Sequence, residues 1–198
     1  MKRHPDPSFR RLAVQLLGHL MLLLLLQLIL SAGAAAAPSR LSDTEAGRRL
    51  MINYIVHFAH HLQWPIEVFS GTGAPFRICL LEQPDLLAPL ASQLKYHRVD
   101  GRPVEVAGLP PGEKLEARRC QILVLGEVSP DYWRELMLAL EFFPVLTVSD
   151  VRGFTAAGGM IGFVGRGPQV AVRLNKTMFD RSELKIGSSL FRLTNGAD

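Results

Sequence analysis

The chain has 198 residues and a formal net charge of +4 at pH 7. The first 37 residues hold four of the 22 basic and one of the 18 acidic side chains, so the remainder carries only +1. A nearly neutral domain without a basic stripe gives no electrostatic case for binding nucleic acid. The remaining residues, about 160, are enough for one domain with its own core.

Residues 1–36 have the three parts of a secretory signal peptide. Basic side chains come first, an apolar run from Leu12 to Ala32 follows, and small residues precede Pro38. We expect cleavage at about residues 34–37, where A-x-A sites overlap. An uncleaved membrane anchor is the alternative, because a run of about 20 apolar residues can span a bilayer. Both alternatives place residues 40–198 on the far side of the membrane.

From residue 42 to residue 150 the sequence alternates between helix and strand patterns. Apolar residues at three- and four-residue steps predict helices, whereas short apolar runs beside turn residues predict strands. Ser42 and Glu45, three residues apart, predict a capping box at the start of the first helix, and Trp64-Pro65 predicts its end. The predicted helices cover residues 45–62, 85–94 and 131–140, and the predicted strands cover 76–81, 102–106, 121–125 and 144–148.

The pattern changes after Asp150. Two strands, 160–164 and 169–174, are joined by Gly165-Arg166-Gly167-Pro168, which predicts a hairpin. Two polar-apolar segments, at 176–182 and 186–193, close the chain. The sequence therefore predicts the α/β class: a single compact domain with a largely parallel central sheet, flanking helices and a C-terminal β-hairpin.

Cys79 and Cys120 are the only cysteines of the chain. Export to an oxidising compartment makes a disulfide between them the expected state. The loop that it would close is long enough for roughly 4 kcal/mol of stabilisation in the chain-entropy model. Two buried free thiols are the alternative, since each would behave as a small apolar side chain.

We find no assembled catalytic or metal site in the sequence. His57 and His61, four residues apart, could share a metal, but a third ligand is not evident and solvated histidines explain the pair equally. Ser149-Asp150 follows a predicted strand, yet no nucleophile elbow or phosphate-binding glycine loop is present. We therefore predict no enzymatic activity, no metal and no cofactor.

Gly158 and Gly159 lie between a turn at Phe154 and the strand that begins at Met160. Glycines permit positive φ and close approach of the backbone to other groups. They either shape a loop for a ligand or partner, or simply turn the chain.

Six segments, taken in order, resemble the YfiR family of bacterial periplasmic repressors of membrane diguanylate cyclases. The resemblance covers residues 45–193, and its most specific part is PVLTVSDVRGF followed by GGMIGFV. The six segments are HFAHHLQWP (57–65), FRICLL (76–81), RCQILVL (119–125), PVLTVSDVRGF (144–154), GGMIGFV (158–164) and LKIGSSLFRL (184–193).

The resemblance implies a non-enzymatic regulatory domain of residues 40–198 in the periplasm. It would bind the periplasmic sensor part of an inner-membrane diguanylate cyclase and repress it, which lowers cyclic-di-GMP and biofilm formation. An outer-membrane lipoprotein would sequester the repressor, and a homodimer is an expectation at the level of the family. Cys79 and Cys120 match family cysteines that pair, while Thr155 and Gly162 replace a second pair found in some members.

The resemblance also bears on particular residues of this chain. The family has asparagine and lysine where His57 and His60 stand, which favours an exposed helix face over a metal site. For the partner-binding surface we predict the surroundings of five residues: Trp64, Phe154, Gly158, Gly159 and Met160. The alternative function is a periplasmic small-ligand sensor that acts on a membrane histidine kinase, which would need a pocket.

Overall fold

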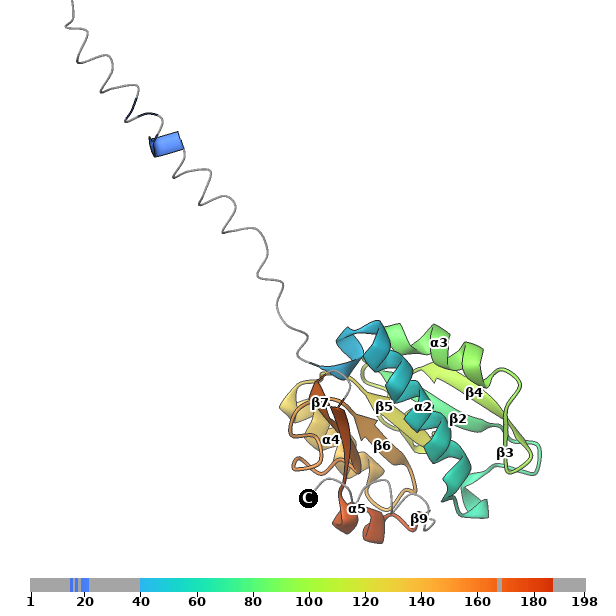
Figure 1. Ribbon diagram of the computed structural model, residues 1–198. Coiled ribbons are helices and arrows are strands. Elements are labelled where there is room, and N and C mark those ends of the chain that lie inside the picture. The colour runs from blue at the N-terminus through green and yellow to red at the C-terminus, as the bar shows by residue number, and fades with distance from the viewer. Residues whose placement is uncertain (1–14, 16, 18, 22–39, 167–168, 187–198) are drawn as a thin grey trace, which may run out of the picture. The chain divides into compact units, whose positions relative to one another are not determined.

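The structure is a computed structural model of the chain and describes residues 15, 17, 19–21, 40–166 and 169–186 (Figure 1). The chain divides into two units, residues 1–37 and residues 38–198. The signal peptide predicted for residues 1–36 lies almost wholly outside the described residues. In the parts that are described, no helix has the length and apolar character needed to cross a membrane.

A mostly parallel sheet forms the centre of the second unit. Its strands are β2 (Phe76–Leu81), β3 (Arg98–Val99), β4 (Arg102–Gly108), β5 (Ile122–Leu125), β6 (Leu146–Ser149), β7 (Ile161–Arg166) and β8 (Gln169–Leu174). The seven strands lie in the order β3-β4-β2-β5-β6-β7-β8. All neighbours from β4 to β7 are parallel, whereas β3 and β8 pair antiparallel at the two edges. The predicted α/β class, parallel centre and C-terminal hairpin are confirmed.

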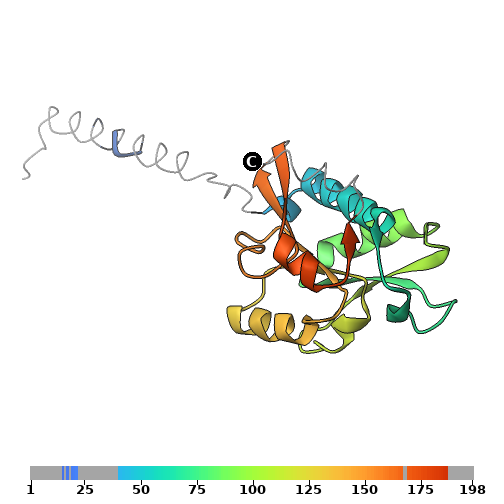
Figure 2. The same cartoon turned by 90° about the horizontal axis from the view of Figure 1, so that it is seen from below.

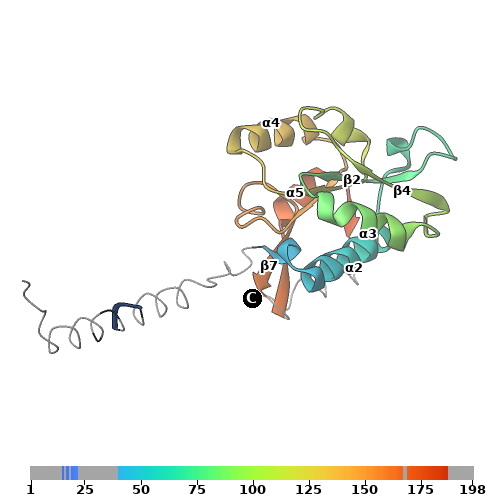
Figure 3. The same ribbon diagram turned by 90° about the horizontal axis from the view of Figure 1, so that it is seen from above.

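Helices cover both faces of this sheet. The helices are α2 (Glu45–His61), α3 (Pro84–Leu94), α4 (Pro130–Leu140) and α5 (Lys176–Arg181), and the 3₁₀ turns are η1 (Leu41–Asp43), η2 (Ile66–Val68) and η3 (Glu116–Arg119). Figures 2 and 3 show from two sides that the sheet separates α2 and α3 from α4. The segment 176–182, for which no element type was predicted, is the short helix α5 and one further residue.

The two faces of the sheet carry separate apolar cores. Ile78 and Leu80 of β2 pack towards α2 and α3, while Cys79 and Leu81 join the cluster beneath α4. All four residues of β5 are buried, and they also alternate between the two clusters. Continuous apolar strands are typical of a parallel sheet that is covered on both sides.

The start of α2 differs from the predicted capping box. Thr44 is the N-cap, and its Oγ1 accepts a hydrogen bond from the Gly47 N–H at 3.0 Å. Ser42 lies one turn earlier, in η1, where its backbone bonds elsewhere in the domain. The prediction was wrong because an N-cap hydroxyl must belong to the residue directly before the helix, and here that residue is Thr44.

Three short strands were not predicted from the sequence, and one of them is β3, described above. β1 (Leu62–Gln63) directly follows α2 and pairs antiparallel with β9 (Lys185–Ile186). The segment predicted at 186–193 lies outside the described residues, apart from Ile186.

Candidate functional site

The connection between β6 and β7 contains four of the five residues predicted at a partner surface. The Gly159 N–H donates to the Phe154 carbonyl oxygen at 2.9 Å, and a β-carbon at Gly159 would overlap the Phe154 ring. Gly158 has a φ of +101°, in the left-handed region that favours glycine. The glycine pair therefore lets the loop fold tightly around Phe154.

Trp133 of α4 fixes this loop against the helix. Its Nε1 donates to the Ala157 carbonyl oxygen at 2.8 Å, and its ring centroid lies 4.8 Å from that of Phe154. On the other side of the loop, the Met160 N–H donates to Thr147 Oγ1 at 3.0 Å. Phe154 and Met160 are only 6 % and 3 % exposed, so they support the loop from inside.

An apolar cleft opens between this loop, α4 and α5. It has a volume of about 460 Å³, and we call it the α4 cleft. Its apolar lining includes Trp133, Met137, Leu140, Phe143, Met160 and Met178. Methionine side chains are flexible and polarizable, and they are common at surfaces that adapt to a partner. Gly158 and Met160 line this cleft, so the predicted loop does form part of a concave surface.

Two large apolar side chains stand exposed where the cleft meets solvent. Leu138 of α4 is 66 % exposed and Phe142, just after the helix, is 81 % exposed; both line the cleft. Phe142 also has a φ of +70°, which is uncommon for a bulky residue. Its neighbour Phe143 is held beneath the Arg118 guanidinium, 4.4 Å from the ring centroid. Strained backbone at an exposed aromatic residue is a feature that recurs at functional sites.

Charged side chains accompany this apolar surface. Arg134, Glu141 and Arg181 all line the α4 cleft and are exposed. Arg134 pairs with Asp131 at 3.0 Å on the helix surface, where such a pair contributes little to stability. An apolar centre with charges around it is the usual anatomy of a protein–protein contact surface.

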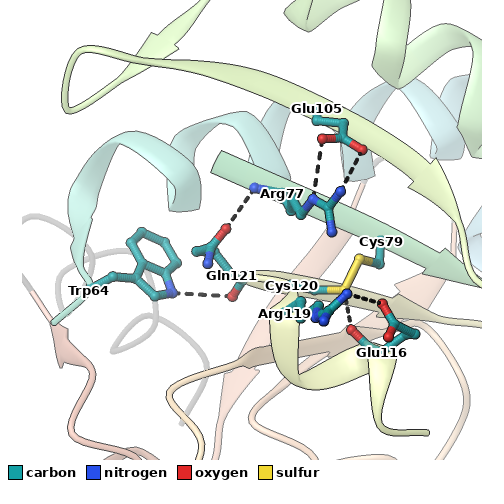
Figure 4. The surroundings of a disulfide bond; sticks show 8 residues. All are labelled: Trp64, Arg77, Cys79, Glu105, Glu116, Arg119, Cys120 and Gln121. Atoms are coloured by element: carbon teal, nitrogen blue, oxygen red, sulfur yellow. Dashed lines mark hydrogen bonds and ion pairs between the residues drawn. A yellow bond between two sulfur atoms is a disulfide. The ribbon is translucent and has the colours of Figure 1, made fainter. Parts of the chain in front are cut away.

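Trp64 lies apart from the α4 cleft. Figure 4 shows its indole beside the start of β5, where Nε1 donates to the Gln121 carbonyl oxygen at 3.2 Å. The ring packs edge-on against Phe76, with centroids 4.8 Å apart, and the residue is 8 % exposed. Of the five predicted partner residues, the structure thus brings Phe154, Gly158, Gly159 and Met160 together and leaves Trp64 elsewhere.

The predicted disulfide between Cys79 and Cys120 is present (Figure 4). The two Cα atoms are 5.9 Å apart, within the usual range for a disulfide. Gln121, the next residue, exchanges hydrogen bonds with Arg77: its side-chain oxygen accepts from the Arg77 N–H at 2.7 Å, and its own N–H donates to the Arg77 carbonyl oxygen at 2.9 Å. The disulfide therefore joins β2 to the residues just before β5, beside the hydrogen bonds between Arg77 and Gln121.

The carboxyl ends of the central strands are occupied by the protein's own side chains. Open α/β folds commonly bind ligands in the crevice beside these ends, where the strand order reverses. Here the Gln83 amide donates to Asp150 Oδ1 at 3.3 Å, and Ser149 Oγ donates to the Leu125 carbonyl oxygen at 2.8 Å. Ser149 Oγ also accepts from the Val151 N–H at 3.0 Å, so this serine serves the backbone.

The structure places His57 beside His61, with ring centroids 4.0 Å apart. Residues 40–166 and 169–186 contain no group of three or more metal-ligating side chains.

Apart from Gly158 and Met160, the residues that line the α4 cleft were not predicted from the sequence; Trp133, Met137, Phe142 and Met178 are among them. The sequence predicts an amphipathic helix at residues 131–140. Leu138 lies on the polar side of that helix, and it was the signal for an exposed apolar surface. Met178 lies far along the chain from α4, so only the fold brings it to the cleft.

The YfiR/HmsC-like family matches residues 48–195, which spans nearly all of the second unit. No curated protein matches the chain. Because the family match covers more than half of the sequence, the chain belongs to the YfiR/HmsC-like family.

Proposed function

We propose that this protein is a non-enzymatic periplasmic regulator that binds and represses an inner-membrane diguanylate cyclase. Membership of the YfiR/HmsC-like family supports a role in diguanylate cyclase signalling. The signal-like residues 1–36 and the disulfide between Cys79 and Cys120 are compatible with an oxidising compartment outside the cytoplasm. The partner would be the periplasmic sensor part of that cyclase.

The observation that carries the proposal is the exposed pair Leu138 and Phe142 at the α4 cleft. Burying an exposed leucine or phenylalanine side chain contributes roughly 1.5–3 kcal/mol, so this pair could supply much of a binding free energy. Contiguous exposed apolar surface in a monomeric domain commonly marks an interaction site. The cleft next to the pair gives a protruding side chain of the partner a place to insert.

Repression follows if the regulator binds the inactive state of the cyclase more tightly than the active state. Binding to the inactive state alone shifts the equilibrium towards it, by an amount set by the difference in affinity. A coupling of about 1–3 kcal/mol changes that equilibrium about 5- to 150-fold. No chemical step on this chain is required for such control.

Two further partners belong to the same proposal. An outer-membrane lipoprotein that competes for the α4 cleft would relieve repression by sequestering the regulator. A second copy of the chain could also form a homodimer, and sedimentation of the exported protein would show this directly.

Affinity capture from membranes tests the contact surface. The exported protein is used as bait, and we expect it to retain a membrane protein with a GGDEF-type cyclase domain. Phe142→Asp and Leu138→Asp should each weaken this capture, because a carboxylate in an apolar contact loses its hydration. Leu115→Asp is a matched control, since Leu115 is 65 % exposed and does not line the α4 cleft.

Ile66→Asp separates this surface from the neighbourhood of Trp64, because Ile66 is 72 % exposed and lies two residues beyond it. Capture that depends on Ile66 but not on Phe142 would move the contact surface to the Trp64 side. No cyclase in any capture would count against the proposal as a whole.

The volume of the α4 cleft supports a second candidate function, a small-ligand sensor that acts on a membrane histidine kinase. About 460 Å³ lies within the usual range of small-molecule sites, roughly 300–1,000 Å³. Native mass spectrometry of the exported protein would detect a retained metabolite. A bound metabolite lost in a Met137→Glu variant would favour this candidate.

A further inference from the structure

All four histidines that follow residue 37 lie in one place in the fold. His57, His60 and His61 occupy the last two turns of α2, and His97 lies in the turn between α3 and β3. The His97 N–H donates to the Leu94 carbonyl oxygen at 2.9 Å, which holds this turn. The Gln93 amide donates to Asn53 Oδ1 at 3.3 Å and joins α3 to α2 nearby.

We propose that His60 and His97 together bind one divalent transition-metal ion, such as Cu²⁺, Ni²⁺ or Zn²⁺. His60 Nε2 and His97 Nδ1 lie 3.3 Å apart, within hydrogen-bond distance, and the ion would take the place of this contact. A metal–imidazole bond is about 2.0–2.1 Å long, so two such bonds at a tetrahedral angle separate their nitrogens by about 3.3 Å. The two rings therefore already stand at the spacing that one ion requires.

The proposed site has two protein ligands, and water would complete the coordination. The described part of the chain has no group of three metal-ligating side chains, so the ion would be exchangeable and accessible to solvent. Imidazole ligands suit copper, nickel and zinc, and divalent copper binds a given nitrogen site most tightly of the three.

The charges around the site leave it able to take up a cation. Lys95 and Arg98 flank His97, but the Arg98 Nη1 donates to the Gly101 carbonyl oxygen at 2.8 Å and the Lys95 ammonium lies 5.2 Å from the Tyr96 ring centroid.

Metal titration of the exported protein, prepared without a histidine tag, tests the proposal. With ZnCl₂ or CuSO₄ added separately at pH 7.5, calorimetry should give one ion per chain, with Cu²⁺ bound more tightly than Zn²⁺. His60→Gln and His97→Gln should each weaken binding at least tenfold. His57→Gln should change it less than twofold, and it serves as the matched control.

A second readout does not depend on calorimetry. Metal that binds only the folded chain raises the melting temperature, and both ligand variants should lose this rise while the His57→Gln protein keeps it. The proposal would be overturned if no ion binds at millimolar concentration, or if His60→Gln and His97→Gln bind as the wild type does. The proposal would also be overturned if His57→Gln and His61→Gln lose binding while His60→Gln and His97→Gln keep it, because His57 and His61 would then hold the ion.

Discussion

The backbone N–H of Ser42 donates a hydrogen bond of 2.6 Å to Asp150 Oδ2, across 108 positions of sequence. Asp150 directly follows β6 and is 6 % exposed, and its other oxygen accepts from Gln83. The carboxylate thereby ties η1 to the carboxyl end of the sheet. An aspartate after a parallel strand, a position often associated with chemistry, here has a role in holding the fold together.

Replacing Asp150 with alanine should lower the free energy of unfolding by about 2–3 kcal/mol, because a buried N–H loses a charged acceptor. Urea unfolding followed by circular dichroism measures this change. Ser42→Ala is the matched control, since the bond uses the backbone of Ser42 and its buried Oγ has no hydrogen-bond partner in the described part of the chain. An equal loss in both variants would contradict the role given to the carboxylate.

Removing the disulfide with Cys79→Ser and Cys120→Ser together should lower stability by up to roughly 4 kcal/mol, the chain-entropy value for a loop of this length. The native exported protein should show no alkylatable thiol before reduction. Reduced wild-type protein is the control, and it should unfold at the same denaturant concentration as the double variant. Two reactive thiols in the native protein would show that the cysteines are not paired in the cell.

Thr155 and Gly162 should accept an engineered disulfide. A β-carbon built on Gly162 lies 4.0 Å from Thr155 Cβ, within the range found between bonded cysteines. The Thr155→Cys, Gly162→Cys variant should therefore oxidise spontaneously and gain about 2 kcal/mol of stability from closing the short loop. Non-reducing mass analysis after proteolysis detects the bridge, and the Thr155→Cys single variant shows the unbridged baseline. A double variant that keeps two free thiols under oxidising conditions would disprove this geometry.

The histidines of α2 should make stability depend on pH. Burial is the main cause that lowers the pKa of His57 and of His60, and neighbouring imidazoles lower both further. A lowered pKa in the folded state means that the unfolded chain binds more protons, so stability is full above about pH 6.5 and falls as the pH drops through that value.

Urea unfolding at pH 7.5 and pH 5.5, with a chelator present, measures this loss. The His57→Gln, His60→Gln double variant should lose less stability than the wild type between the two pH values. An equal loss in both proteins would assign the pH dependence to other groups.

Strong local periodicity made the main elements predictable. The apolar run FRICLL matches β2 residue for residue, and the helix predicted at 131–140 begins only one residue early in the structure, at Pro130. The pairing of β1 with β9 was not predictable, because a two-residue strand is defined by a partner more than 120 residues away. Local pattern carries no information about such a partner.

The sequence could not predict which apolar side chains of the candidate site are exposed to solvent. Trp64, Phe154 and Met160 are buried, whereas Phe142, which has the same apolar character, is 81 % exposed. The type of a side chain does not decide on which side of the packed fold it lies. The Gly158-Gly159 loop was recognisable because only glycine fits its backbone, but the cleft beside it needed the packing of α4 and α5.

Cyclic-di-GMP in a strain that lacks this protein tests the regulatory role most directly. Deletion should raise the nucleotide level and biofilm, and the exported wild-type protein should restore the lower level, whereas a Leu138→Asp, Phe142→Asp protein exported in equal amount should not. An unchanged nucleotide level in the deletion strain would contradict repression of a diguanylate cyclase.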